Sequence, residues 1–349
     1  MYTHYISAPV SGVIGKAVKR ASKLAVIIPF FQREPGILAR ALESIRSQHI
    51  PDGWRVDVIV VDDASPCSAD DETRQITFTG PVRLKVVRQD NGGVAAARNR
   101  GLDEARTDTS LIAFLDSDDI WPANHLARAI RALATGTDFY FTDNRRAGYH
   151  ESCIRERAIE TGKYIATART KDGFLAIPPD RLLGLIIKEF PAQASTVVYK
   201  RSIAPALRFN TTLNAAGEDI LFLCTLVAAA SSAVFDPESC VECGAGLNMY
   251  FAKLSWNNPQ CLPILVDQVI ARRLIDRTVK LSAESRKRID AEIKYSRREL
   301  GSHTAWSLTK FPARVPKPIL RLIKKDAPAA LMLPLDILAG AFSLLARKL

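Results

Sequence analysis

The chain has 349 residues and a mass of 38.4 kDa, which is enough for one large domain or two ordinary ones. Apolar residues make up 47% and charged residues 24%, and with a mean hydropathy of zero this composition excludes a disordered, fibrous or multi-span membrane protein. The net charge of +11 belongs to one end of the chain, because residues 271–349 carry 18 Lys and Arg against 7 Asp and Glu while residues 1–270 are neutral.

The first 160 residues alternate short β-branched runs with helical stretches, which is typical of parallel βαβ units. We expect strands at 24–30, 56–61, 82–87 and 111–115 and helices at 35–48 and 94–105. Sheets of this kind bind ligands beyond the carboxyl ends of their strands. Aromatic or acidic side chains follow three of those ends, and we therefore expect a ligand site there.

The second half of the chain is less regular. Residues 144–180 show no clear period and are predicted to form a variable excursion. A further strand is predicted at 196–199, and a helix from residue 217 to about 230. The sequence thus predicts three parts: an N-terminal extension (1–23), an α/β domain with a mostly parallel sheet (24–257) and a basic helical extension (258–349).

Six cysteines in a chain of this size do not indicate a disulfide scaffold, and residues 1–23 lack the apolar region of a secretory signal. We therefore expect the reducing cytosol as the compartment. Cys240 and Cys243 have the spacing of a redox or zinc pair, but no second Cys or His pair matches them, so we expect no such function.

Asp116 and Asp118 are two residues apart at the end of a predicted strand, so their side chains point to one face. Carboxylates that leave several coordination positions open suit Mg²⁺ or Mn²⁺ bound to a diphosphate. The alternative is a solvated acidic turn that caps the next helix. For an isolated pair the alternative is favoured, so the metal site depends on the surrounding motifs.

Asp62-Asp63 follows a hydrophobic run and could be the acidic end of a dinucleotide-binding strand. That interpretation requires a G-x-G-x-x-G turn after the first strand, and residues 29–34 read PFFQRE instead. Phe31 offers an aromatic face to a base, and Asp63 can accept a hydrogen bond from an imide N–H such as that of uracil. Alternatively, Phe31 is a core residue and Asp63 is a turn residue.

Residues 91–99 (NGGVAAARN) bring small side chains and the Arg98 guanidinium to the start of a helix between two strand ends. A helix N-terminus that can be approached closely favours anions. The alternative is an ordinary glycine turn whose alanines pack against the sheet, and that packing is expected in either case.

Five motifs in this order resemble the inverting glycosyltransferases of family 2, which have a GT-A nucleotide-binding fold: VIIPFFQRE (26–34), VVDDAS (60–65), NGGVAAARNRG (91–101), FLDSDD (114–119) and GED (217–219). The match covers roughly residues 22–235. In addition, PFFQREPGIL, GEDILFLC and GAGLNMY (244–250) are similar to glucosyltransferases that build succinoglycan-type exopolysaccharides. The resemblance implies a UDP-sugar donor and Mg²⁺ or Mn²⁺.

The resemblance also implies a role for each matched residue. Pro29, Phe31, Glu34 and Asp63 would frame the uridine, Arg98 would lie near the base or ribose, Asp116 would hold the ribose side, Asp118 would bind the metal and Asp219 would be the general base. The chain departs from the family in two ways. Phe31-Gln32 replaces the usual aromatic-Asn pair, which leaves the contacts of Gln32 open, and the Q-x-x-R-W motif of processive synthases is absent, which favours one sugar per encounter.

The role of Asp219 can also be argued from chemistry. Inverting transfer is a single in-line displacement, so one carboxylate must take the proton of the acceptor hydroxyl as it attacks the anomeric carbon. We expect the helix that begins at Glu218-Asp219 to keep this carboxylate ionised, since negative charge is favoured at a helix N-terminus. The alternative is that both residues merely cap the helix.

The basic C-terminal segment interleaves apolar and basic residues, as in residues 318–325 (PILRLIKK). A helix of this kind can lie on an anionic membrane surface, where each basic residue contributes on the order of 1 kcal/mol. Residues 327–346 are apolar, but Pro328, Pro334 and Asp336 interrupt them, so the sequence favours surface contact over a spanning helix.

We therefore expect an enzyme at the cytosolic face of a bacterial inner membrane that transfers a hexose, by resemblance glucose, from a UDP-sugar to a lipid-linked oligosaccharide. The alternatives are a lipopolysaccharide or capsule transferase that uses galactose or an N-acetylhexosamine, a nucleic-acid-binding protein, and a nucleotide-sugar sensor without activity. Asp118 and Asp219 argue against the sensor. No nucleic acid is expected as a partner, because the few aromatic residues of the tail match no module that reads DNA or RNA.

Overall fold

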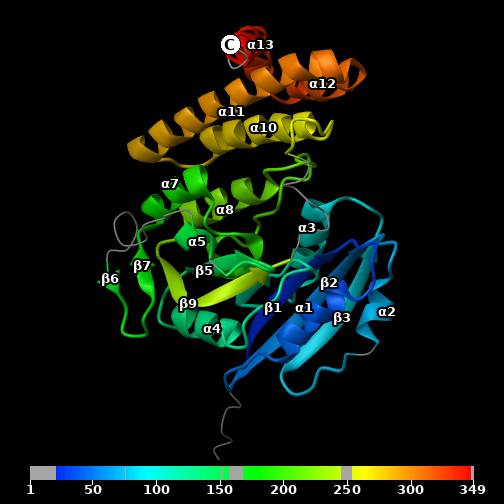
Figure 1. The fold of residues 1–349 in the computed structure, drawn as a ribbon. Coiled ribbons are helices and arrows are strands. Elements are labelled where there is room, and N and C mark those ends of the chain that lie inside the picture. The colour runs from blue at the N-terminus through cyan, green and yellow to red at the C-terminus, as the bar shows by residue number, and fades with distance from the viewer. Residues whose placement is uncertain (1–20, 75, 151, 157–167, 245–253, 347–349) are drawn as a thin grey trace, which may run out of the picture.

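The computed structural model describes residues 21–74, 76–150, 152–156, 168–244 and 254–346. Within these ranges nine strands form one sheet in the order β3-β2-β1-β4-β8-β5-β9-β7-β6 (Figure 1). The strands are β1 (Ser22–Phe30), β2 (Trp54–Asp63), β3 (Val82–Gln89), β4 (Leu111–Phe114), β5 (Phe139–Arg146), β6 (Ala168–Arg169), β7 (Leu175–Ile177), β8 (Val197–Lys200) and β9 (Ala233–Cys243). Residues 1–20 of the predicted N-terminal extension lie outside the described residues.

The mostly parallel α/β sheet predicted from the sequence is confirmed. β1 pairs in parallel with β2 and β4, and β2 pairs in parallel with β3. β8 runs antiparallel between β4 and β5, β9 is parallel to β5, and β7 is antiparallel to β9. The apolar run of β1 is fully buried, as a central strand covered on both faces requires. Because β1 to β5 and β9 share one direction, their carboxyl ends meet at one edge of the sheet.

Helices cover both faces of the sheet and form two hydrophobic clusters with it. α1 (Ile37–Arg46) and α4 (His125–Ala134) lie on one face, and α3 (Val94–Glu104), α7 (Pro179–Glu189) and α8 (Glu218–Ala229) lie on the other. α3 approaches β1 closely, because a Cβ on Gly101 would lie 2.3 Å from Cγ2 of Ile27. Short elements complete this part: α2 (Ala69–Thr73), α5 (Cys153–Glu156), η1 (Ala194–Thr196) and η2 (Arg201–Ile203).

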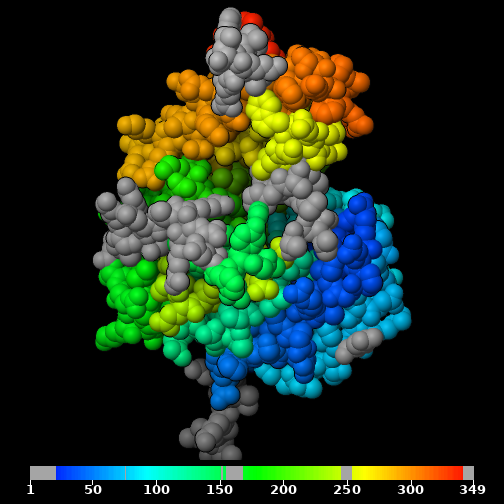
Figure 2. Space-filling model, in the orientation of Figure 1, coloured from blue at the N-terminus to red at the C-terminus, as the bar shows by residue number. Residues whose placement is uncertain are grey.

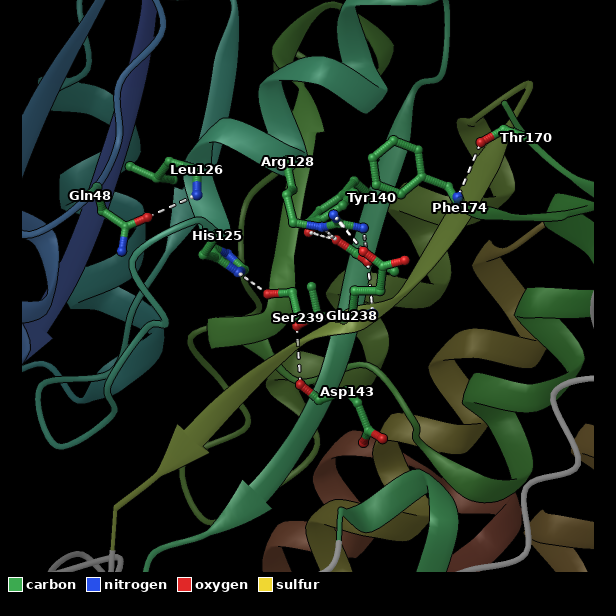
Figure 3. A network of polar contacts seen from close by, with 12 residues as sticks. Gln48, His125, Leu126, Arg128, Tyr140, Asp143, Thr170, Phe174, Glu238 and Ser239 are labelled. Atoms are coloured by element: carbon green, nitrogen blue, oxygen red, sulfur yellow. Dashed lines mark hydrogen bonds and ion pairs between the residues drawn. The ribbon is translucent and has the colours of Figure 1, made fainter. Parts of the chain in front are cut away.

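The pairing of β5 with β9 is interrupted where residues 237–239 are inserted into β9. The register places Thr142 opposite Asp236 and the next residue, Asp143, opposite Cys240. Buried polar side chains gather beside this bulge. Figure 3 shows Arg128 of α4 and Tyr140 of β5 pointing toward it, with Glu238 from the bulge itself. On a strand, Cys240 and Cys243 point to opposite faces, which agrees with the expectation of no zinc pair.

The region 144–180 was predicted to be an irregular excursion, and the structure gives part of it regular form. β5 extends to Arg146, and α5, β6 and β7 lie within the region, with β7 paired to β9. Residues 157–167 of this region lie outside the described residues. The excursion therefore adds β7 and β6 to the sheet beyond β9, and β6 forms its edge.

The C-terminal segment is helical, as predicted: α10 (Cys261–Thr278), α11 (Ala283–Lys310), η3 (Pro312–Arg314), α12 (Pro316–Lys325) and α13 (Ala327–Ala346). α10 and α11 pack on α8 and α7, and α13 packs on α11 (Figure 1). Residues of α10, α11, α12 and α13 belong to the larger hydrophobic cluster, so the segment shares its core with the α/β part. Figure 2 shows the yellow and orange helices seated directly on the domain beneath them. Within the described ranges, no helix combines the length and apolarity that crossing a membrane requires.

Candidate functional site

The ends of β1, β2 and β4 are joined by Gln32, the residue at which the sequence departs from the family pattern. Its backbone N–H donates to Ser65 Oγ at 2.7 Å, and its Nε2 donates to Ser117 Oγ at 3.0 Å. The Gln32 side chain is buried, so these bonds are shielded from water. Gln32 therefore positions the loops after three strands relative to one another, which answers the question that the sequence left open.

Asp63, at the end of β2, holds the glycine turn that precedes α3. Its carboxylate accepts the backbone N–H groups of Gly92 and Gly93, each at 2.8 Å, and Gln89 Nε2 at 2.7 Å. Gly93 has φ +83°, a conformation that favours glycine. The carboxylate thus already accepts three hydrogen bonds from the protein, and contact with a uracil N–H would use its remaining lone-pair capacity.

The other residues predicted around the base lie at the end of β1. Pro29 is buried within the strand, Phe31 is half-buried at the sheet edge and Glu34 is exposed ahead of α1. The guanidinium of Arg33 lies 5.8 Å from the centre of the Phe31 ring. Of these predicted positions, Phe31 combines an aromatic face with partial exposure at the edge where the strands end.

Next to Asp63, a cleft opens at the ends of β2 and β3. It is lined by Asp62, Ala64, Ser65, Ser68, Arg88 and Gln89. Asp62 accepts the backbone N–H of Ser65 at 2.8 Å and that of Ala69 at 3.1 Å, so it fixes the wall of this cleft. Ala64 has φ +57°, which is uncommon for a residue with a side chain. The two acidic residues at the end of β2 therefore have different structural roles. Asp62 fixes the wall of the cleft, and Asp63 fixes the glycine turn.

Arg98 connects the acidic loop after β4 with the start of α8. It lies on α3, almost fully buried, and donates from Nη2 to Asp116 Oδ1 at 2.8 Å and from Nη1 to Glu218 Oε1 at 3.3 Å. Its guanidinium also lies 5.2 Å from the centre of the Phe209 ring. The sequence placed Arg98 near the base or ribose. In the structure it bridges the acidic loop after β4 and the first turn of α8.

The acidic loop after β4 is fixed from two sides. The backbone N–H of Asp116 donates to Ser195 Oγ at 2.9 Å, and the backbone N–H of Gly244 donates to Asp119 Oδ1 at 2.8 Å. Burial, together with the negative charges of Asp116 and Asp118, raises the pKa of Asp119 to about 8. Asp119 therefore stabilises the loop from inside. The side chain of Asp116 is 37% exposed and Asp118 is half-buried, so both are more accessible than Asp119.

Gly244 packs directly against Asp118. A Cβ at this position would lie 2.4 Å from the backbone oxygen of Asp118 and 2.7 Å from its Oδ2. No larger residue fits here without displacing the carboxylate. The neighbouring motif residues 245–250 lie outside the described residues.

The acidic loop suits a divalent ion that is only partly held by protein. Within the described ranges, no group of three or more Cys, His, Asp or Glu side chains is arranged to enclose a metal. Mg²⁺ and Mn²⁺ do not need such a cage, because they bind through one or two carboxylates together with water and phosphate oxygens. Asp118, partly exposed at the edge of the sheet, therefore fits the metal ligand that the sequence predicts.

Asp219 lies at the start of α8, next to Glu218. Its Oδ1 accepts the backbone N–H of Ile220 at 2.7 Å. Burial raises the pKa of Asp219, and the positive charge of Arg98 opposes that rise. Burial and the neighbouring Asp219 raise the pKa of Glu218 to about 7, again opposed by Arg98. The helix N-terminus favours the ionised form of Asp219, whereas burial raises the pKa of both carboxyl groups and brings the pair closer to the working range of a general base.

Several residues of the site were missed from the sequence, among them Ser195, Gly244 and Asn99. Asn99 exchanges two hydrogen bonds with the backbone of Phe209, at 2.7 and 2.9 Å, and so fixes the chain ahead of α8. These contacts join residues 79 to 125 positions apart in the sequence. The one available signal was that Asn99 and Gly244 lie within the quoted motifs NGGVAAARNRG and GAGLNMY.

Comparison with known proteins agrees with this geometry. Residues 25–180 match the model of Glycosyl transferase family 2. The succinoglycan biosynthesis protein ExoW of Rhizobium meliloti (strain 1021) is 35% identical over 246 residues, which cover 69% of this chain and 74% of that protein. The chain therefore spans about three quarters of the length of that protein.

Among solved structures, TarS of S. aureus (residues 1–349) is similar with a TM-score of 0.58 at 17% identity, over 91% of this chain and 88% of that one. A mannosyltransferase of Pyrobaculum calidifontis, solved with GDP-Man and Mn²⁺, has a TM-score of 0.55 at 20% identity, over 93% and 81%. At these identities the structures show the fold, which is GT-A-like. The match to the family model and the similarity to ExoW establish that the chain belongs to glycosyl transferase family 2 and is a glycosyltransferase.

Proposed function

We propose that this glycosyltransferase moves a hexose, glucose in the first instance, from a UDP-sugar to a lipid-linked oligosaccharide in bacterial exopolysaccharide biosynthesis, with inversion at the anomeric carbon. The observation that carries the proposal is buried Arg98, which ties Asp116 on the donor side to Glu218 beside Asp219. The similarity to a succinoglycan biosynthesis protein supports the acceptor class. TarS, which has this fold, has been solved with UDP and with UDP-GlcNAc, and this supports a UDP-sugar donor.

Each group then has one task in a single displacement. Phe31 and Asp63 receive the uracil, and Asp116 receives the ribose. Asp118 holds Mg²⁺ or Mn²⁺, which when bound offsets the negative charge of the departing diphosphate. Asp219 takes the proton of the acceptor hydroxyl while its oxygen attacks the anomeric carbon and the bond to UDP breaks on the opposite face, so the configuration inverts.

A second candidate is the transfer of galactose or an N-acetylhexosamine to a lipopolysaccharide, capsule or related polymer. The complex of TarS with UDP-GlcNAc favours it. A local similarity of 32% over 102 residues to the minor teichoic acid biosynthesis protein GgaA of Bacillus subtilis (strain 168) points in the same direction. Both candidates share the residues above and differ in the sugar pocket and in the acceptor.

Many basic residues of the C-terminal helices are paired with acidic residues, which bears on the alternative that this tail binds nucleic acid. Seven arginines of the C-terminal helices form ion pairs with carboxylates of the same chain: Arg272, Arg273, Arg277, Arg286, Arg288, Arg297 and Arg321. Their charge is therefore partly offset within the protein, which leaves fewer free cations for phosphate contacts. These ion pairs favour a tail that packs as part of the enzyme over a tail that binds nucleic acid.

The proposed reaction is tested by measuring UDP release from a panel of UDP-sugars, with membrane extract as the source of acceptor and Mg²⁺ or Mn²⁺ present. We expect UDP-glucose to give the highest rate, with EDTA abolishing the release. Asp118→Asn should remove activity without unfolding the protein. A higher rate with UDP-GlcNAc or UDP-galactose would select the second candidate, and full activity in EDTA would contradict the metal site.

The part of the tail that we propose to meet an anionic membrane is the exposed apolar stripe of α12 and α13. Its members are Leu320 and Ile323 of α12 and Leu331, Leu335 and Leu338 of α13, which are 48% to 79% exposed. Leu320 and Ile323 lie on one side of α12, bordered by exposed Lys317 and Lys324. Leucines that project from a helix edged by lysines fit a bilayer with anionic headgroups, where both apolar burial and charge attraction favour binding.

Replacement of Leu331 and Leu335 by Ser should lower the fraction of protein that sediments with vesicles containing anionic lipid. Both side chains are exposed, so the fold should be retained, whereas deleting the tail would also remove buried Leu322 and Leu333. Tyr295→Ser, on α11 and equally exposed, is the matched control and should bind vesicles like the wild type. The proposed membrane contact would be contradicted if the wild-type protein did not bind anionic vesicles and bound DNA or RNA tightly.

A Glu218→Gln variant should keep its kcat to lower pH than the wild type. Two neighbouring carboxylates take up their first proton as a pair, and here the pKa of Glu218 is raised to about 7. The wild-type enzyme should therefore lose kcat at a higher pH than an ordinary Asp, with a pKa of about 4, would give. Removing one negative charge lowers the pKa of the carboxyl that remains. The measurement is kcat against pH, and an unchanged acid limb would contradict the shared titration.

Gly244→Ala should weaken UDP binding in the presence of Mg²⁺, by on the order of 10-fold or more, because perturbing the support of a metal ligand has effects of this size. The added Cβ would collide with Asp118. Binding of UDP measured by calorimetry with and without Mg²⁺ checks the prediction. The loss should appear only with metal, and an equal loss without it would show that the change acts on the fold instead.

A further inference from the structure

The loop that leads into α8 is held by the C-terminal helices. Gly217, the residue before the helix, has φ +87° and lies so close to α10 that a Cβ on it would be 2.6 Å from Cβ of Ala271. Asp267 of α10 is fully buried, and its Oδ2 accepts the backbone N–H of Ala215 at 2.8 Å. The chain just ahead of Asp219 is therefore bonded to a helix from outside the α/β part.

The positive charge that pairs with Asp267 comes from Arg321 of α12. Nη1 of Arg321 forms an ion pair with Asp267 Oδ1, and Nη2 of the same guanidinium donates to the backbone oxygen of Thr212. One side chain thus contacts both the carboxylate that holds the loop and the loop itself. Arg321 is suited to this because its planar fork can donate in two directions at once.

Inside the loop at residues 210–217, Asn210 Oδ1 accepts the backbone N–H of Thr212 at 2.9 Å, and Leu213 is buried in the larger hydrophobic cluster. The contacts from α10 and α12 add to this local support. Thr212 and Asn214 are exposed, and the loop contains no described helix or strand. On its other side Asn99 holds Phe209, and Arg98 holds Glu218. The segment from Phe209 to Glu218 is therefore held at its ends by α3 and in its middle by α10 and α12.

We propose that Arg321 is a positioning residue for the catalytic step: from α12, through Asp267 and the Thr212 carbonyl, it sets the 212–217 loop so that Asp219 meets the acceptor hydroxyl. The inference rests on the proposed role of Asp219 as the base. It gives the C-terminal helices a part in turnover in addition to contact with a membrane. α12 thus carries the exposed Leu320 and Ile323 on one side and the contact to the catalytic loop on another.

The test compares Arg321→Met and Arg321→Lys with Arg297→Met in the full-length protein. Arg297 is the matched control, because it is similarly exposed and its ion pair with Asp336 joins α11 to α13 instead of contacting the loop. In Arg321→Met we expect kcat to fall by on the order of 10- to 100-fold, because a small misplacement of a catalytic group has effects of this size. KM for the UDP-sugar and the Kd for UDP should stay at wild-type values. Arg321→Lys should recover part of the loss, and Arg297→Met should keep the wild-type kcat.

Amide hydrogen exchange measures the same effect without reference to activity. Exchange of residues 212–220 should become faster in Arg321→Met and stay at the wild-type rate in Arg297→Met. Asp267→Asn, which keeps the shape of the side chain, should show the same change in milder form and serves if Arg321→Met does not fold. Wild-type kcat and exchange in the Arg321 and Asp267 variants would overturn the inference, as would a loss of UDP binding equal to the loss of kcat.

Asp219→Asn is measured alongside these variants and separates the two proposals. Full turnover in Asp219→Asn would remove the base assignment, while the exchange data would still decide whether Arg321 orders the loop. Loss of turnover in Asp219→Asn together with wild-type behaviour of Arg321→Met would leave the base in place and remove the positioning role.

Discussion

Replacing Asp219 by Asn should lower turnover by on the order of 100-fold or more, while the UDP-sugar still binds as it does to the wild type. The Asn side chain has nearly the same shape and can still accept the backbone N–H of Ile220, so α8 should begin as before. What is lost is the group that takes the acceptor proton. Because the proposed donor ligands belong to β1, β2, α3 and the loop after β4, the Kd for UDP should be unchanged.

Glu218 is the alternative base, and the same experiment addresses it. Glu218 is bonded to Arg98, whereas Asp219 accepts the backbone N–H of Ile220 and retains lone pairs for a substrate. Glu218→Gln should therefore retain most of the turnover at neutral pH. If Asp219→Asn remains active and Glu218→Gln does not, the roles of the two residues are exchanged.

The parallel half of the sheet could be predicted because its strands are long, apolar and buried. The run at 24–30 and the run at 56–61 both proved to be strands, and the acidic residues that follow two of the strands lie at one sheet edge as expected. A buried parallel strand reads as a continuous apolar run, and the order βαβ fixes where its carboxyl end lies. Local pattern was therefore sufficient here.

β9 could not be predicted, because its sequence contains the signals that argue against a strand. Pro237 and Glu238 interrupt the run AVFDPESCVEC, and a proline normally excludes a central strand. The structure resolves the conflict by placing both residues in the bulge between Asp236 and Cys240. Such an insertion depends on the partner strand and on α4, which lie about 100 residues earlier in the chain.

The identity of the candidate site residues followed from the motifs, but their connections did not. The bond from Arg98 to Glu218 joins residues 120 positions apart, and no spacing rule predicts it. The burial of the two carboxylates at the start of α8 was not predicted, for the same reason. A helix N-terminus is a local feature, whereas the burial that raises the pKa of Asp219 arises from packing with distant segments.

Replacing Asp236 by Ala should lower the free energy of unfolding by about 3 to 5 kcal/mol, the cost of removing one partner from a buried ion pair. Asp236 is fully buried and accepts Arg128 Nε at 2.5 Å and Nη2 at 2.7 Å, together with the Tyr140 hydroxyl at 2.7 Å. Its removal leaves a buried hydroxyl without this acceptor and a guanidinium with only the outer carboxylate of Glu238. Urea unfolding followed by circular dichroism measures the change.

Glu238→Gln is the matched control, because Glu238 contacts the same guanidinium at 2.9 Å but its side chain is 56% exposed. An exposed pair contributes less than about 1 kcal/mol, so this variant should unfold close to the wild type. Equal losses in the two variants, or a loss below about 1 kcal/mol in Asp236→Ala, would contradict the importance of burial here.

The Asp236 network should also affect the candidate catalytic site, although Asp236, Arg128 and Tyr140 are not themselves predicted site residues. The bulge that it braces sets the register of the last part of β9, where Ile120 and Glu242 form a bridge and Gly244 meets the acidic loop. A change in that register would move Gly244 away from Asp118 and Asp119. Folded Asp236→Ala should therefore also bind UDP more weakly in the presence of Mg²⁺, whereas Glu238→Gln should bind it like the wild type. Unchanged metal-dependent UDP binding in folded Asp236→Ala would show that the end of β9 keeps its position without the network.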